Sequence, residues 1–274
     1  MSVVAAIQMA SGPKVDANLI EAARLIRIAV TQGAKLVALP ENFAIMGMKE
    51  TDKVLISEED GHGPIQKFLA DQARKHGIWL VGGTIPLKAN AKDKVRASCL
   101  VFNDRGERVA RYDKIHLFDV NLAEDNETYR ESETIEPGEN MVTIETPFCK
   151  LGLAICYDLR FPELFRYLAR DGAEVIVMPS AFTDITGKAH WETLVRARAI
   201  ENLAYMIAPG QGGFHANGRH TYGDSMIVDP WGHVLDRLPK GSGVVMAEVD
   251  CRQVQSIRST FPALQHRKVF CELS

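Results

Sequence analysis

Short apolar runs alternate with stretches of helical periodicity along the first part of the chain. Val3 to Met9 is an apolar run that suits a buried strand, and residues 16–33 follow with apolar side chains at helical spacing. Residues 36–39 form a second apolar run, and residues 64–77 and 78–83 repeat the order of helix and strand. This alternation predicts an α/β fold, in which helices cover a central sheet.

The middle and the end of the chain favour antiparallel pairing instead. Residues 97–102 and 108–112 flank residues 103–106, whose sequence NDRG suits a hairpin turn. From Ala204 onward the apolar segments are again short and separated by turn residues. We therefore expect a mixed sheet arrangement, with some strands joined by helices and others by hairpins.

No linker of low complexity divides the chain, so we expect a single domain over residues 1–274. Residues 119–140 are acidic and irregular, and we interpret them as a long structured loop of the kind that often carries function. A solvated surface excursion is the alternative. The tail, about residues 256–274, is basic and is a candidate for packing on a partner subunit.

The charge balance and the cysteines argue against several classes of protein. With 32 basic and 35 acidic residues the net charge is −3, which gives no overall attraction to nucleic acid or to acidic membranes. No apolar run reaches the ~18 residues of a membrane helix, and the N-terminus lacks the positive region of a signal peptide. The five cysteines are odd in number and form no CxxC pair, so we expect no disulfide framework and a reducing, cytoplasmic location.

Three segments share one format, in which an apolar run ends in polar or small residues. They are LVALPE, which ends at Glu41, GLAICYD, which contains Cys156, and VIVMPSAF, which ends with residues 180–182. The carboxyl ends of parallel strands gather at one edge of an α/β fold, where ligands bind. If these strands run parallel, the three segment ends lie near one rim and form a candidate site.

Cys156 is a candidate nucleophile because it lies at a strand end, before the start of a helix. A helix N-terminus favours negative charge on a thiolate, or on an oxyanion formed beside it. The alternative is a small buried hydrophobe, which is the commoner role of a cysteine after an apolar run. Asp158 is better interpreted as a helix cap, and Arg160 suits either the surface or the binding of a carboxylate.

Glu41, Lys114 and His116 are not specific signals when each is taken alone. A glutamate at a strand end and a lone lysine are usually solvated, and a histidine in such a position is usually structural. Charged side chains are rarely buried unless they are paired or functional. The combination of these residues is therefore more informative than any one of them.

In combination, the residues and their surroundings resemble the nitrilase, or carbon–nitrogen hydrolase, superfamily. The resemblance covers essentially the whole chain: LVALPENF, RYDKIHLFD, LGLAICYDLRFPEL, SAFTDITGKAHWETLVRARAIEN and YGDSMIVDPWG. It implies a four-layer α-β-β-α sandwich whose protomers pair, and so a homodimer or a larger homo-oligomer. It also implies that Glu41 is the general base, that Lys114 stabilises the tetrahedral intermediate, and that Cys156 is the nucleophile.

The resemblance further implies a second glutamate that supports the site. Glu131 matches this position, and Glu127 and Glu133 are the alternatives because they lie close by in the sequence. The superfamily resemblance implies no metal and no other cofactor.

These residue types suit the hydrolysis of an amide. A thiol is mostly protonated at neutral pH and needs a nearby base to become nucleophilic. An ammonium group and a backbone N–H, with that of Tyr157 as the candidate, would stabilise the oxyanion, and one such donor contributes roughly 3 kcal/mol. We expect an acyl-enzyme thioester on the cysteine, with ammonia leaving first and a carboxylic acid second.

Within the superfamily, the sequence CYDLRFPE resembles the amidase branches rather than the true nitrilases. SAFTDITGKAHWE, RARAIEN and QGGFHANGRHTYGDSMIVDPWG resemble the branch that hydrolyses deaminated glutathione, although Lys188 replaces a proline that is usual there. The alternatives are an ω-amidase that acts on acids like 2-oxoglutaramate and an N-carbamoyl amino acid hydrolase. We expect the substrate to contact Tyr157, Arg160, Phe182 and His190.

Deaminated glutathione carries two carboxylates, so the site would need cations. Several are available in the similar segments, and we expect Arg160 alone to lie near the pocket. The full set of these residues is Arg160, Arg196, Arg198, His215 and Arg219.

A metalloenzyme and a binding protein without catalysis are the rival classes. The eight histidines are scattered without the HxxxH or HExxH spacing that is typical of metal sites. A binding scaffold would need none of Glu41, Lys114 and Cys156, so their joint presence favours an enzyme.

Overall fold

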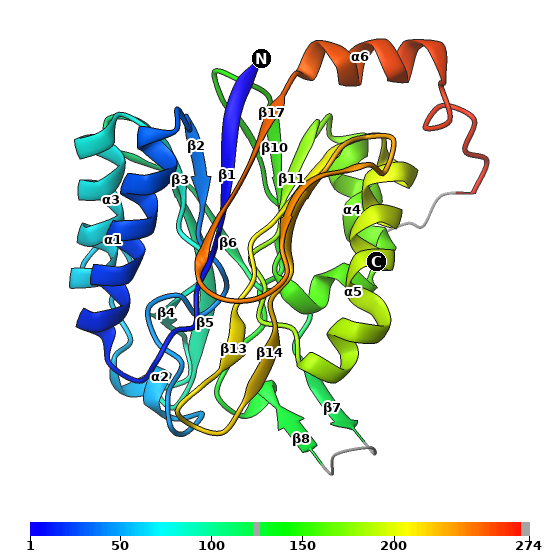
Figure 1. The fold of residues 1–274 in the computed structure, drawn as a ribbon. Helices are drawn as coiled ribbons and strands as arrows, with labels where there is room; N and C mark the ends of the chain where they lie inside the picture. The colour runs from blue at the N-terminus through cyan, green and yellow to red at the C-terminus, as the bar shows by residue number, and fades with distance from the viewer. Residues whose placement is uncertain (123–126, 270–274) are drawn as a thin grey trace.

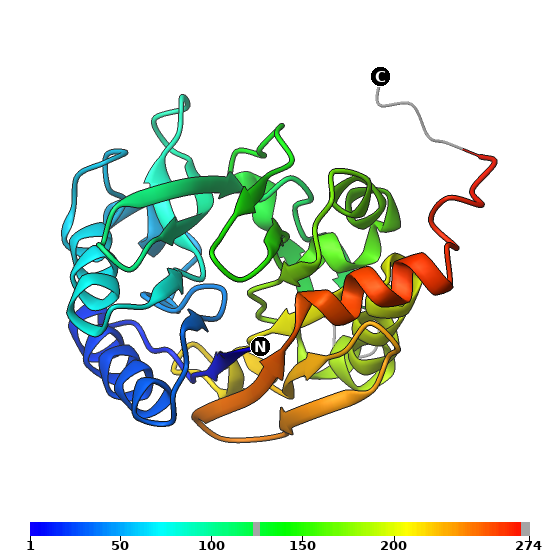
Figure 2. The same cartoon turned by 90° about the horizontal axis from the view of Figure 1, so that it is seen from above.

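The computed structural model describes residues 1–122 and 127–269. Two β-sheets lie face to face at the centre, and a pair of helices covers the outer face of each sheet (Figure 1 and, from above, Figure 2). The helices are α1 (Val15–Thr31) and α3 (Pro64–His76) on one side, and α4 (Pro162–Arg170) and α5 (Asp184–Asn202) on the other. The expected α/β fold with four layers, α-β-β-α, is confirmed. None of the described helices has the length and apolar character needed to cross a membrane.

The first sheet has seven strands in the order β17-β1-β2-β3-β5-β4, and β6 pairs with β5. β1, β2 and β3 run parallel, whereas the other pairs are antiparallel. The strands are β1 (Ser2–Gln8), β2 (Leu36–Ala38), β3 (Trp79–Val81), β4 (Ile85–Lys88), β5 (Val95–Phe102), β6 (Arg108–Asp113) and β17 (Gly243–Val249).

The second sheet has six strands in the order β16-β15-β12-β11-β10-β9. Its central strands β10, β11 and β12 are parallel, and the flanking strands are antiparallel. The strands are β9 (Thr143–Glu145), β10 (Lys150–Leu153), β11 (Val175–Val177), β12 (Tyr205–Ala208), β15 (Ser225–Val228) and β16 (Val234–Leu238).

β1 is buried on both faces because it lies between the second sheet and the helices α1 and α3. Val4 and Ala6 belong to the core between the two sheets, whereas Ala5 and Ile7 belong to the core under the helices. Two-sided burial explains why this segment is apolar at successive positions rather than at every second one.

Residues 119–140 are not the irregular loop that was expected throughout. They contain a hairpin of β7 (Asp119–Leu122) and β8 (Glu127–Arg130), followed by the single turn η1 (Glu131–Glu133). Neither strand is an apolar run, so the usual strand signal is missing. The remaining short elements are α2 (Asp52–Leu55), η2 (Cys156–Arg160), β13 (Gly212–Phe214), β14 (His220–Tyr222) and α6 (Cys251–Thr260).

α5 begins at Asp184, where the sequence gives little sign of a helix. Thr183 caps the helix, since its Oγ1 accepts the Thr186 N–H at 3.4 Å. The first turns contain Gly187, and glycine is a weak helix former, so their sequence does not indicate a helix.

The expectation of no disulfide framework is wrong, because Cys149 and Cys251 form a disulfide. Cys149 precedes β10 and Cys251 begins α6, so the bond fastens α6 to the second sheet. The two cysteines are 102 residues apart, and no local spacing indicates the pair. Cys99 and Cys156 are free thiols, and Cys271 lies outside the described residues. The cytoplasmic location stays a prediction.

Candidate active site

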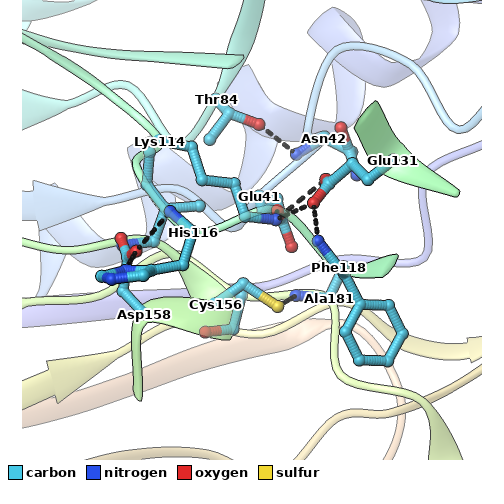
Figure 3. A network of polar contacts seen from close by, with 12 residues as sticks. Glu41, Asn42, Thr84, Lys114, His116, Phe118, Glu131, Cys156, Asp158 and Ala181 are labelled. Carbon is cyan, nitrogen blue, oxygen red and sulfur yellow. Dashed lines mark hydrogen bonds and ion pairs between the residues drawn. The ribbon is translucent and has the colours of Figure 1, made fainter. Parts of the chain in front are cut away.

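A cavity of about 150 Å³ opens beyond the carboxyl ends of the parallel strands β2, β10 and β11. Glu41 follows β2, Cys156 follows β10 and Phe182 follows β11, and all three side chains line the cavity. Lys114 and Glu131 from the middle of the chain line it too (Figure 3). The structure therefore brings the three strand ends together in one site.

Glu41 is held in place by hydrogen bonds of its own carbonyl and of the next residue, Asn42. Asn42 adopts a left-handed φ of 56°, and its N–H donates to Thr84 Oγ1 at 2.8 Å. Gln211 Nε2 donates to the backbone carbonyl of Glu41 at 3.0 Å. The carboxylate is consequently buried, with 4% of the side chain exposed, and does not face solvent as an ordinary glutamate at a strand end would.

Lys114 is buried at the end of β6, where its backbone N–H donates to the Ala97 carbonyl at 3.0 Å. Its Nζ lies 2.8 Å from Glu41 Oε1 and 2.8 Å from each carboxylate oxygen of Glu131. Burial acts to lower the pKa of the lysine, but the charges of Glu131 and Glu41 outweigh it and hold the pKa well above its ordinary value. Lys114 is therefore a cation at neutral pH.

Glu131 is the first residue of η1, and it is held by a backbone donor as well as by the lysine. The Phe118 N–H donates to its Oε2 at 2.7 Å. Burial acts to raise the pKa of Glu131, but the charge of Lys114 and these hydrogen bonds lower it overall. Glu133 does not line the cavity, and the side chain of Glu127 lies outside the described part of the chain.

Cys156 occupies a sharp turn between β10 and η2. Its φ of 47° is left-handed, and its N–H donates to the Pro179 carbonyl at 2.9 Å. Its Sγ accepts the Ala181 N–H at 3.5 Å (Figure 3). Burial and the charge of Glu41 raise the pKa of the thiol well above its ordinary value, although Lys114 acts in the opposite direction. The resting group is a thiol, so it needs Glu41 as a base when it attacks.

Asp158 ties the cysteine turn to the segment that carries the lysine. Its carboxylate accepts the Ile155 N–H and the Tyr112 hydroxyl, each at 2.7 Å, and lies 2.7 Å from His116 Nδ1. The His116 ring stacks on Phe161 with 3.7 Å between the ring centroids. Asp158 caps η2 as predicted, and in addition it is a positioning residue between two strands.

We expect the change Asp158→Asn to lower kcat/KM about ten- to a hundredfold. An amide in place of the carboxylate turns one acceptor into a donor, which leaves a buried N–H or hydroxyl without a partner at a cost of roughly 1–3 kcal/mol. Steady-state kinetics should be combined with the rate at which iodoacetamide alkylates Cys156, which reports the position of the thiol. Asp104→Asn, in the exposed hairpin turn, is the matched control. An unchanged alkylation rate and unchanged kinetics would exclude the positioning role.

Three of the four residues expected to contact the substrate line the cavity: Tyr157, Arg160 and Phe182. The Arg160 guanidinium lies 5.4 Å from the ring centroid of Phe182 and 5.8 Å from that of Tyr157. His190 does not line the cavity; it is exposed on α5, where its Nδ1 is 3.2 Å from Arg160 Nη1. The prediction that His190 contacts the substrate therefore has no support in the geometry, and its contact is with Arg160.

Of the other cations considered, Arg196, Arg198 and His215 are bound to groups outside the cavity. Arg219 lines the cavity, so the expectation that Arg160 alone of these cations lies near the pocket is wrong. A lone arginine after a glycine in a polar turn has no feature that distinguishes it from a solvated charge. Lys188, the departure from the branch pattern, forms an ion pair within α5 and does not line the cavity.

Potential metal ligands gather at one place in the described part of the chain, and it is not the cavity. Cys149, Glu174 and Cys251 lie within 4.8 Å of one another, but two of them form the disulfide. None of the three lines the cavity.

Comparison with known proteins identifies the family of this chain. The carbon–nitrogen hydrolase model matches residues 3–259. This chain belongs to the carbon–nitrogen hydrolase family. It is 44% identical over 266 residues to a protein of Synechocystis named deaminated glutathione amidase, with 96% of this chain and 97% of the relative covered. The family resemblance that the sequence motifs indicated is confirmed.

Solved structures of related carbon–nitrogen hydrolases share the fold. Saccharomyces cerevisiae Nit3, a member of branch 10 of the nitrilase superfamily, is 35% identical and has a TM-score of 0.88, with 98% of this chain and 97% of that chain covered. The Caenorhabditis elegans NitFhit protein is 36% identical with a TM-score of 0.90 over 97% of this chain. This chain spans 65% of that longer protein. As a carbon–nitrogen hydrolase with amidase relatives, the protein is a hydrolase that acts on amides.

Proposed function

We propose that this carbon–nitrogen hydrolase cleaves its amide through a thioester on Cys156. The observation that carries the proposal is the buried cluster in which Lys114 Nζ lies 2.8 Å from both Glu41 and Glu131, in the wall of the cavity that Cys156 lines. On this proposal Glu41 is the base, Lys114 is the donor for the oxyanion and Cys156 is the nucleophile.

In the first half of the reaction Glu41 takes the thiol proton while Cys156 Sγ attacks the carbonyl carbon. Lys114 and a backbone N–H from the first turn of η2, with that of Tyr157 as the candidate, stabilise the oxyanion; one such donor contributes roughly 3 kcal/mol. Glu41 then gives the proton to the amide nitrogen, the carbon–nitrogen bond breaks, and the amine leaves. The acyl group remains on sulfur.

In the second half a water molecule attacks the thioester carbon. Glu41 takes a proton from the water, the carbon–sulfur bond breaks, and the sulfur recovers the proton from Glu41. The products are the free thiol and a carboxylic acid. Glu41 accepts and returns each proton in turn, so these steps need no cofactor.

For the substrate we propose deaminated glutathione. The support is the name of the similar proteins and a cavity that contains Arg160 and Arg219, which suit the two carboxylates of this compound. Deaminated glutathione has no primary amide. Its scissile bond joins a 2-oxoglutaryl group to cysteinylglycine, so the amine released is the dipeptide. The release of ammonia applies to ω-amides such as 2-oxoglutaramate.

We expect kcat/KM for deaminated glutathione to exceed that for 2-oxoglutaramate by about ten- to a hundredfold. The second carboxylate adds a charge-assisted hydrogen bond that contributes roughly 1.5–3 kcal/mol. Intact glutathione should be a poor substrate, because its α-ammonium group would enter a cavity that already holds unpaired cations. Cysteinylglycine and ammonia are measured under one set of conditions. A tenfold preference for 2-oxoglutaramate would instead support the ω-amidase alternative.

We also propose that the protein is a cytoplasmic homo-oligomer that pairs through its C-terminal region. Trp231 and Phe261, the residue after α6, are 53% and 52% exposed, and their rings lie 5.7 Å apart. An exposed aromatic pair next to the tail is typical of an interface. Light scattering should give at least twice the chain mass, and Trp231→Glu should lower it. A monomeric wild type would contradict this.

A further inference from the structure

Arg219 is held by its backbone, but its guanidinium forms no ion pair among the described residues, although the charge of Glu50 acts on it from farther away. Arg219 lies between β13 and β14. Its backbone N–H donates to Asn217 Oδ1 at 3.0 Å, and its backbone carbonyl accepts the His215 N–H at 2.9 Å. The guanidinium lies 5.0 Å from the ring centroid of Tyr129 in β8. Its Nη1 contacts Met46 Sδ at 3.9 Å, and its buried Nε has no hydrogen-bond partner among the described residues.

An arrangement of this kind is unfavourable unless something else binds there. A buried donor without an acceptor costs roughly 1–3 kcal/mol, and more when the group is charged. Arginine is always protonated, and its planar fork matches a carboxylate in shape and charge. The Tyr129 ring and the backbone hydrogen bonds hold the fork of Arg219 in place, so an anion that enters the cavity would suit its free Nε.

Arg160 is a second cation in the same cavity without a carboxylate partner. Among the described side chains its polar contact is with His190 at 3.2 Å, and it lies over the rings of Phe182 and Tyr157. Its surroundings differ from those of Arg219. Both residues are half-buried as a whole, but the contact of Arg160 with His190 is exposed, whereas the Nε of Arg219 is buried.

The charge of the cavity as a whole agrees with two anionic groups in the substrate. Among the described lining residues five side chains are cationic and three are carboxylates, so the net charge is +2 when the thiol is neutral. The carboxylates are already paired: Lys114 contacts Glu41 and Glu131, and Lys53 contacts Glu50 at 2.6 Å. Of the three cations that remain, Arg130 is exposed and donates to the Tyr129 carbonyl and to Asn121 Oδ1, so Arg160 and Arg219 are the two available to a ligand.

We propose that Arg219 binds the carboxylate of the acyl half of the substrate, and that Arg160 binds the carboxylate of the leaving amine. This rests on the proposed amidase function and deepens it, because it defines the substrate class as amides that carry an anionic group on each side of the scissile bond. The acyl half stays on Cys156 after the first step, so it belongs beside the buried Nε of Arg219. The amine has to leave, so it belongs beside Arg160, whose contact with His190 is exposed.

The test compares 2-oxoglutaramate with pentanamide, an uncharged amide with the same number of carbon atoms. Arg219→Gln should lower kcat/KM for 2-oxoglutaramate about ten- to a hundredfold and change that for pentanamide less than about twofold. Arg219→Lys should recover part of the loss. In Arg160→Gln the loss with deaminated glutathione should exceed the loss with 2-oxoglutaramate. Arg170→Gln, which removes an exposed arginine stacked 5.3 Å from the Tyr167 ring centroid outside the cavity, is the matched control.

A binding measurement separates this proposal from the proposed function. The product 2-oxoglutarate should slow the alkylation of Cys156 by iodoacetamide in the wild type and in Arg170→Gln, but not in Arg219→Gln. Equal losses with both amides, or protection that persists in Arg219→Gln, would overturn the role of Arg219. A wild type that is protected by 2-oxoglutarate but hydrolyses no amide would overturn the proposed function and leave the carboxylate site standing.

Discussion

Replacing Cys156 by alanine is expected to abolish amide hydrolysis while the protein stays folded. The change removes one sulfur atom from a side chain that faces the cavity, so it creates little new empty space in the core. The left-handed φ of 47° is no worse for alanine than for cysteine. Without the thiol no thioester forms, and the rate should fall by at least about a thousandfold. Turnover and the thermal unfolding midpoint are measured on the same preparation.

Cys99→Ala is the matched control for this change. Cys99 is the other free thiol of the described residues, and it is fully buried in the core between the sheets, where burial raises the pKa of its thiol strongly. Its loss should leave catalysis intact and lower stability moderately. If Cys156→Ala retained activity, or if Cys99→Ala removed it, the nucleophile would have been assigned to the wrong residue.

Glu41→Gln is expected to lower kcat about a hundred- to ten-thousandfold, the usual contribution of a positioned base. Glutamine has almost the same shape, and Lys114 keeps both of its contacts with Glu131, so the site should remain ordered. The thiol of Cys156 has a raised pKa and does not ionise by itself at neutral pH, which makes its proton transfer depend on Glu41. Rapid-mixing experiments should show that the formation of the thioester is slowed.

Glu59→Gln is a control with the same change of chemistry, because Glu59 forms an exposed ion pair with Lys88. It should leave kcat unchanged, since exposed ion pairs contribute little. A Glu41→Gln enzyme with more than about a tenth of the wild-type kcat would mean that another group takes the thiol proton.

The strand ends of the site could be predicted from the sequence because burial leaves a clear pattern there. β2, β10 and β11 lie inside the fold, so their segments are apolar until the chain reaches the cavity, and the change in character marks Glu41, Cys156 and Phe182. Lys114 and Glu131 do not end an apolar run, so the sequence has no such signal for them. Their contacts with each other and with Glu41 join residues 17 and 73 positions apart, which only the folded chain brings together.

Other features depend on tertiary contacts that have no local signal. Arg219 is a polar residue in a polar turn, and it becomes part of the site because β13 and β14 place it against Tyr129. The hairpin of β7 and β8 pairs only with itself and has no apolar face that would identify its strands. The disulfide joins two cysteines from distant segments, and neither has a neighbouring cysteine in the sequence.

Acid quenching followed by mass spectrometry tests the thioester on Cys156 most directly. Thioesters survive in acid, so wild-type enzyme mixed with deaminated glutathione and quenched within its first turnover can be digested and its peptides mapped. We expect the peptide that contains Cys156 to gain the mass of a 2-oxoglutaryl group, and we expect no such gain in Glu41→Gln over the same interval. An adduct on Cys99, or cysteinylglycine released in the first turnover without any adduct, would contradict the mechanism.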